Sequence, residues 1–234
     1  MRRALTVVTV AVLALLATTA FAGDIVTMPT ANQLRAGEVD VAYYILNLDD
    51  VCGPSGMVEE VKAQTVYVGI TDWLEVDAHR YDPDVGKTDT IMNATVLLRR
   101  EDANGPDVVV GVRDIAGNMG GAPGTAPRMS YHISMARTIN PPIAGPPKGP
   151  IFRVHASLGT KDVTLLGEKR HQGAFGGLQV LARPSYPQIG LIALYDGQDA
   201  ITGVTFTPKG WPTIKGGTFG RHSWVGINYT FNIF

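Results

Sequence analysis

The sequence predicts an all-β protein: a closed antiparallel up-and-down barrel that crosses a membrane with about 12 strands. The last residues, 224–234, alternate apolar with small or polar side chains, as a strand with one buried face does. Similar segments recur along the chain with turn residues between them. Charged residues make up only 18% of a chain with 27 glycines and 15 prolines, and amphipathic helical periods are missing, which favours strands over βαβ units.

The start of the chain has the layout of a secretory signal peptide. The basic residues Arg2 and Arg3 precede an apolar run over 4–16, and residues 20–22 offer the small-x-small pattern of a cleavage site. The run is too short for a stable spanning helix, so an uncleaved anchor is the weaker alternative. We therefore expect a signal peptide at 1–22 and a single outer-membrane barrel domain at 23–234, in a Gram-negative-type bacterium.

The first strands are expected at 39–45, 66–70 and 74–79. In each of them valine, isoleucine, leucine or tyrosine side chains share one face, while the other face is smaller or more polar. Residues 71–72, Thr-Asp, predict a tight turn between the second and third strands. The best helix candidate after the signal peptide is 58–64, which is short and runs directly into a strand.

The remaining strands are separated by breakers such as the Asn-Gly-Pro sequence at 104–106. They are expected at 92–98, 108–112, 129–135, 152–158, 178–183, 189–195, 201–207 and 224–234. This makes eleven segments in all, whereas bacterial single-chain barrels have an even number of strands. A twelfth could come from 213–220 or from 24–28, so we expect 12 strands, with 10 as the alternative.

Three connecting segments have compositions that draw attention. Cys52, the only cysteine, cannot form an internal disulfide and lies in a loop-like sequence, which predicts an unreactive loop thiol. The glycine-rich stretch 117–124 lacks the Lys-Ser/Thr of a phosphate-binding loop. The proline-rich stretch 141–150 is expected to be a stiff connection. The hydrogen-bonded ladder of a closed barrel would stabilise the chain without a disulfide.

The alternation also predicts which side chains face the inside of the barrel. Charged and histidine side chains fall on the face opposite the apolar one, where they would line the lumen and pair with each other. These candidates are Glu75, Asp77, His79, Arg113, His132, Arg153 and His155. A β-sandwich would give the same period with its apolar face inside. The signal peptide, the terminal aromatic residue and the absence of disulfides favour the barrel.

Catalytic and metal-binding motifs are weak. The row Glu75, Asp77 and His79, with steps of roughly 7 Å along one strand face, is better explained as a salt-paired wall than as a cation site. His132 and His155 lie on the same face as several serines, but the Gly-x-Ser-x-Gly elbow of a hydrolase is missing. We expect no catalytic residue, no metal and no cofactor. A net charge of −1 gives no broad attraction to nucleic acid.

Both ends of the chain resemble a known family. Residues 26–39 are similar to the Pro-Ser/Thr-Ala…Leu-x-x-Gly opening of the YjbH-like outer-membrane proteins, and residues 190–208 resemble that family's Glu-Tyr-Asp-Gly…Asn-x-Gly repeat. Residues 225–231 match its closing strand. Two positions depart from the pattern: Leu194 replaces an acidic residue, and Phe234 is out of phase with the apolar face ending at Ile233.

The resemblance implies a barrel accessory to exopolysaccharide export or cell-envelope organisation, without enzymatic activity. Its partners would be outer-membrane lipid and either a polysaccharide or export-complex proteins, with no nucleic acid. Two alternatives remain open: a secreted or periplasmic β-sandwich that acts as a binding module, and an outer-membrane lipid hydrolase.

Overall fold

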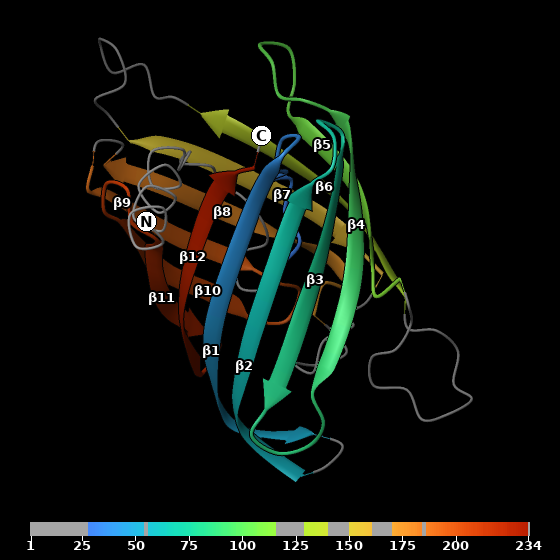
Figure 1. Cartoon of the computed structure of the whole chain (residues 1–234), viewed down its shortest axis with the longest axis vertical. Coiled ribbons are helices and arrows are strands. Elements are labelled where there is room, and N and C mark those ends of the chain that lie inside the picture. The colour runs from blue at the N-terminus through green and yellow to red at the C-terminus, as the bar shows by residue number, and fades with distance from the viewer. Residues whose placement is uncertain are drawn as a thin grey trace, which may run out of the picture.

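The computed structural model describes residues 28–53, 56–115, 129–139, 150–160, 170–183 and 186–233. Twelve strands form one closed antiparallel barrel in which each strand pairs with its neighbours in sequence and β1 pairs with β12 (Figure 1). The strands are β1 (Glu38–Gly53), β2 (Gly56–Gly69), β3 (Leu74–Pro83), β4 (Asp89–Arg99), β5 (Asp107–Arg113), β6 (Ser130–Ile139), β7 (Ile151–Gly159), β8 (Gly173–Arg183), β9 (Gln188–Tyr195), β10 (Ala200–Thr207), β11 (Thr213–Phe219) and β12 (His222–Asn232). The predicted all-β, up-and-down barrel of 12 strands is confirmed.

The uncertain twelfth strand is β11, Thr213–Phe219, which pairs with β10 and β12. The predicted turn at 71–72 is also present: Thr71 Oγ1 accepts hydrogen bonds from the backbone N–H groups of Trp73 (3.2 Å) and Leu74 (3.0 Å). The described residues contain no helix that is long and apolar enough to span a membrane. The signal peptide at 1–22, Phe234 and the stretches 117–124 and 141–149 lie outside the described residues.

Two local interpretations were wrong. The helix candidate 58–64 belongs to β2, where buried Val61 and Ala63 alternate with exposed Lys62 and Gln64. Strand pairing with β1 on one side and β3 on the other outweighs the weak local helical pattern. Cys52 lies not in a loop but near the end of β1, opposite Met57.

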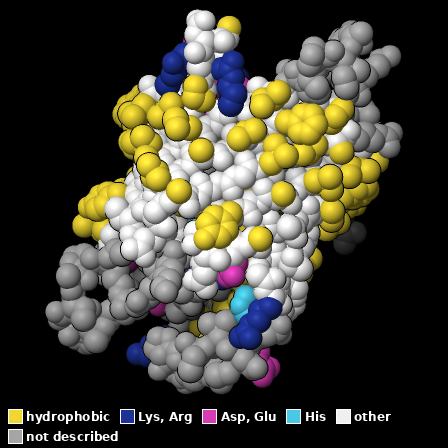
Figure 2. Space-filling view, turned by 180° about the vertical axis from the view of Figure 1, so that it is seen from behind, with side chains coloured by type: hydrophobic (Ala, Val, Ile, Leu, Met, Phe, Trp, Pro, Cys, Tyr) yellow, Lys and Arg dark blue, Asp and Glu magenta, His cyan; other side chains and the backbone are white. Residues whose placement is uncertain are grey.

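The outer wall of the barrel is apolar. Large hydrophobic side chains are exposed on strands around the wall, and Figure 2 shows them spread over one side of the molecule. Examples are Val66, Met92, Ile133, Leu158, Leu191, Val204 and Val225. Exposed aromatic side chains also lie near both ends: Trp73, Tyr186 and Trp211 in turns at the end that holds Glu38, and Tyr131 and Tyr195 at the opposite end. The fold therefore excludes two stacked sheets with the apolar faces sealed between them.

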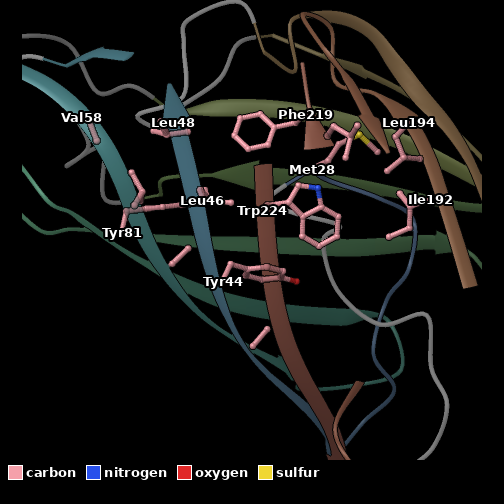
Figure 3. Close-up of a cluster of buried hydrophobic side chains, with 14 of the residues drawn as sticks. Met28, Tyr44, Leu46, Leu48, Val58, Tyr81, Ile192, Leu194, Phe219 and Trp224 are labelled. Carbon is pink, nitrogen blue, oxygen red and sulfur yellow. The ribbon is translucent and has the colours of Figure 1, made fainter. Parts of the chain in front are cut away.

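The interior contains an apolar cluster on one side, formed mainly by β1, β2 and β9 to β12 (Figure 3). Tyr44 and Trp224 are its largest members, with ring centroids 6.4 Å apart. Each ring lies over a glycine: a Cβ atom on Gly226 would be 2.4 Å from Tyr44, and one on Gly203 would be 2.6 Å from Trp224. Glycine at these wall positions thus leaves room for the aromatic rings.

Candidate functional site in the polar interior

The seven polar residues that the alternation assigned to the inner face are all buried, with at most 9% of each residue exposed. They lie on β3, β5, β6 and β7, on the side of the barrel opposite the apolar cluster. Strand alternation explains this placement most clearly on β6 and β7, where exposed Tyr131 and Ile133 flank His132 and exposed Val154 lies between Arg153 and His155. Two of their contact networks lie on β3 and around Arg153, and other members contact buried groups in separate pairs.

The first network is the row on β3. His79 Nε2 lies 2.7 Å from Asp77 Oδ1, and Asp77 also accepts a hydrogen bond from the side-chain amide of Asn93 on β4. His79 Nδ1 lies 3.2 Å from the hydroxyl of Tyr81. Asp77 and His79 are thus paired within the wall, whereas Glu75 accepts a hydrogen bond from the backbone N–H of Leu34. Among the described residues there is no group of three or more His, Cys, Asp or Glu side chains that could hold a metal ion.

The second network is centred on Arg153 of β7. Its Nη2 donates to Asp107 Oδ2 (2.7 Å) at the start of β5, and its Nη1 donates to Glu101 Oε2 (3.1 Å) in the β4–β5 connection. Nη1 also donates to the hydroxyl of Thr138 at 3.0 Å. One guanidinium therefore faces two carboxylates near the barrel end that holds Glu38, and its charge is compensated within the protein.

The remaining basic residues are Arg113, His132 and His155, which belong to three different strands. His155 Nε2 lies 2.8 Å from Gln179 Oε1, and Arg113 Nη1 lies 3.1 Å from His171 Nδ1. The Nδ1 atoms of His132 and His155 have no hydrogen-bond partner among the described residues. Gly111 makes space for His132, since a Cβ atom there would lie 2.2 Å from the imidazole ring.

The serines near these histidines are engaged elsewhere. The hydroxyl of Ser157 donates to that of Ser134 at 2.8 Å, and Ser130 Oγ lies 3.4 Å from Thr160 Oγ1. A serine nucleophile needs a histidine base within hydrogen-bond reach. Ser157 and Ser134 instead contact each other, and His155 Nε2 contacts Gln179.

The alternation did not predict that residues 28–34 lie inside the barrel, before exposed Arg35 and Ala36 lead out to β1. Met28, Ala31 and Leu34 are fully buried, and Asn32 and Gln33 are almost so. Residues 28–36, which we call the inner segment, belong to no strand and lead into β1. The segment contacts the barrel wall on two sides, at Gln179 of β8 and at Glu75 of β3. The segment has no strand-like alternation. The only signals in its sequence that could have indicated an interior position are its amide side chains and its place directly before the first predicted strand.

Hydrogen bonds attach the inner segment to four parts of the wall. The backbone N–H of Leu34 donates to Glu75 Oε2 at 2.7 Å. The side chain of Gln33 donates to the carbonyl of Thr95 at 2.9 Å. Asn32 accepts from Arg153 Nε at 2.6 Å and donates to Gln179 Oε1 at 3.4 Å. Two of the predicted polar residues, Glu75 and Arg153, thus hold this segment.

A further cluster lies at the opposite end of the barrel from Glu38, where β9 turns into β10. Arg170 is buried, forms ion pairs with Asp196 and Asp199, and lies over the ring of Phe219 at 5.2 Å. The Asp196-Gly197 turn is a tight one: Asp196 Oδ1 accepts from the backbone N–H groups of the next residues, and Gly197 has a φ of 98°. This left-handed conformation favours glycine.

No protein-family model and no curated protein sequence matches this chain. Its chemistry must therefore be inferred from the barrel itself. The interior combines buried ion pairs with a peptide segment that occupies the space between the walls. Arg153 links the two, since it contacts both Asp107 and Asn32.

Proposed function

We propose that the chain is a small outer-membrane β-barrel that is accessory to exopolysaccharide export or cell-envelope organisation and is not an enzyme. The observation that carries the proposal is the inverted distribution of polarity. Apolar side chains are exposed on the outer wall, whereas Glu75 and Asp77 of β3, both charged residues of β5 and Arg153 of β7 are buried inside. A water-soluble protein places these groups the other way round.

The energetic argument follows from the exposed side chains. Moving a Leu, Ile or Val side chain from water into an apolar environment is worth about 1.5–3 kcal/mol. The outer wall exposes many such residues, so its transfer into lipid amounts to tens of kcal/mol by the same scale. Aromatic side chains near both ends of the strands match the girdles that sit at the two membrane interfaces.

The cellular role rests on the resemblance of residues 26–39 and 190–208 to the YjbH-like family. The structure adds one constraint to it. Because the inner segment and the Arg153 network occupy the lumen, we do not propose an open diffusion pore. A closed barrel suits an accessory role in a larger export assembly, with outer-membrane lipid around it and polysaccharide or export proteins as partners.

The location is tested by fractionating the envelope and by electrophoresis in detergent. We expect the mature chain to sediment with the outer membrane and to migrate faster unheated than boiled, because a closed barrel resists unfolding by detergent. A monodisperse chain in detergent-free buffer would refute the proposal.

The cellular role is tested by deleting the gene and measuring secreted exopolysaccharide. We expect secretion to fall and to recover when the wild-type gene is restored. A second wild-type copy carrying a premature stop codon is the matched control. Normal secretion in the deletion strain would refute the proposed polysaccharide role but not the barrel assignment.

The lipid-hydrolase alternative is tested with the purified barrel and a chromogenic ester. We expect no hydrolysis above the background of empty detergent micelles. Activity that disappears in both the His155→Ala and the Ser157→Ala variants would instead establish an enzyme.

A further inference from the structure

The inner segment, residues 28–36, closes the barrel from within, and we propose that the space it occupies is a latent pore that conducts small cations when this segment leaves. This inference goes beyond the accessory role and requires only the proposed membrane location. It is argued from the segment's burial, its contacts and the wall that it covers.

The first step is the width of the lumen. Wall side chains fill barrels of eight strands, whereas barrels of 16 to 18 strands leave an aqueous channel. This barrel has 12 strands and accommodates a peptide segment between its walls: Ala31 packs against Val109 and Ala136 on β5 and β6, while Met28 joins the apolar cluster beside Phe219 and Trp224 (Figure 3). The wall alone therefore does not fill the lumen.

The second step is the nature of the attachment. Residues 28–34 carry no charged side chain, so no ion pair ties this part of the segment to the wall. Its contacts with Glu75, Thr95, Gln179 and Arg153 are hydrogen bonds, and each wall group can exchange them for water. The segment is thus held by contacts that are weak individually, in contrast to the continuous ladders of the strands.

The third step is the charge of the exposed path. Arg153 faces two carboxylates, Asp107 and Glu101, and Glu75 adds a negative charge on the other side of the segment. Among all buried charged side chains of the described residues, carboxylates also outnumber the cations, which are Arg113, Arg153, Arg170 and Lys215. A pore lined in this way attracts cations and repels anions, as acidic rings do in cation-selective channels.

Gly69 marks where the segment leaves the lumen. A Cβ atom at this position would lie 1.9 Å from the carbonyl oxygen of Arg35, and the backbone N–H of Gly37 donates to the carbonyl of Gly69 at 2.8 Å. The wall is therefore shaped to let the chain turn from the interior into β1. This close fit explains how the segment closes the lumen without a further strand.

The experiment measures single-channel currents in planar phospholipid bilayers bathed in potassium chloride. Three chains are compared with the wild type: one lacking residues 28–34, one with Ala31→Trp, and the matched control Ala156→Trp, whose alanine is exposed on the outer wall. Ala31 is fully buried, so tryptophan cannot fit there while the segment remains inside.

We expect the deletion and Ala31→Trp chains to conduct several-fold more than the wild type, and Ala156→Trp to match the wild type. In the deletion chain a synthetic peptide of residues 28–36 should reduce the current, while a scrambled peptide should not. Glu75→Gln in the deletion chain should lower the preference for potassium over chloride, read from the reversal potential in a salt gradient.

Heat-modifiable mobility of each chain tests the membrane barrel separately. If the shortened chain does not fold, the full-length Ala31→Trp chain carries the test. A folded, membrane-inserted Ala31→Trp or deletion chain that stays as closed as the wild type would overturn the latent pore while leaving the barrel intact. Anion preference in the open chain would refute the charge argument.

Discussion

Replacing Arg153 by methionine tests whether buried ion pairs stabilise the interior of the barrel. Its guanidinium is 2.7 Å from Asp107 and 3.1 Å from Glu101, and only 9% of the side chain is exposed. Methionine keeps much of the length and removes the charge, which leaves the carboxylate of Asp107, itself 7% exposed, without its cation. Removing one partner of a buried pair costs about 3–5 kcal/mol. We expect the free energy of unfolding to fall by that amount.

The matched control is Arg99→Met. Arg99 lies 2.9 Å from Asp102, but the two side chains are 44% and 56% exposed, so solvent screens the pair. Exposed pairs of this kind contribute about 0.2–1 kcal/mol. The double variant Arg153→Met with Asp107→Asn should recover part of the loss, because the uncompensated charge is removed along with its partner.

The assay is urea unfolding of the barrel in phospholipid vesicles, followed by tryptophan fluorescence. Equal losses for Arg153→Met and Arg99→Met would refute the argument, since burial would then make no difference to the value of the ion pair. The argument would also be refuted if the double variant were less stable than Arg153→Met alone.

Three further predictions concern the outer wall and the interior. Leu191→Arg places a charge on the outer wall and should lower the free energy of unfolding by about 2–4 kcal/mol if the residue lies near the bilayer midplane. The control Gln198→Arg, in the following turn, should change it by less than about 0.5 kcal/mol. Urea unfolding in vesicles compares the two variants. Gly226→Ala puts a methyl group 2.4 Å from the ring of Tyr44, and unfolding should show a loss of about 1–3 kcal/mol; unchanged stability would contradict this packing. Ser134→Ala removes one buried hydrogen bond and should cost about 0.5–1.5 kcal/mol, and a gain in stability would argue against it.

The sequence predicted the wall of the barrel well, because alternation is a local property. In a strand, successive side chains point to opposite faces, so Tyr131 and His132 had to lie on different sides wherever β6 was placed. The terminal strand and the turn at 71–72 followed in the same way from neighbouring residues. The helix candidate 58–64 failed because pairing with β1 and β3, which is not local, decided the conformation.

The interior contacts could not be predicted in this way. Arg153 meets Asp107 across 46 positions and Asn32 across 121 positions of the sequence. Such contacts depend on the strand register and on the path of the inner segment, and neither leaves a periodic signal in the residues involved. The alternation indicated that Glu75 and Arg153 share the inner face, but not that both bind the same peptide segment.

The seam between β1 and β12 explains how this chain holds a closed shape with only one cysteine. The two strands pair from Glu38 with Asn232 to Asn47 with Ser223. Asp40 of β1 adds side-chain contacts across the seam, accepting hydrogen bonds from Asn228 at 2.9 Å and from Thr230. Without β12, both β1 and β11 would become free edges, and in the proposed lipid environment each unpaired backbone group would cost several kcal/mol. The strand at the end of the sequence is therefore a condition for the whole wall, which accounts for its strict alternation.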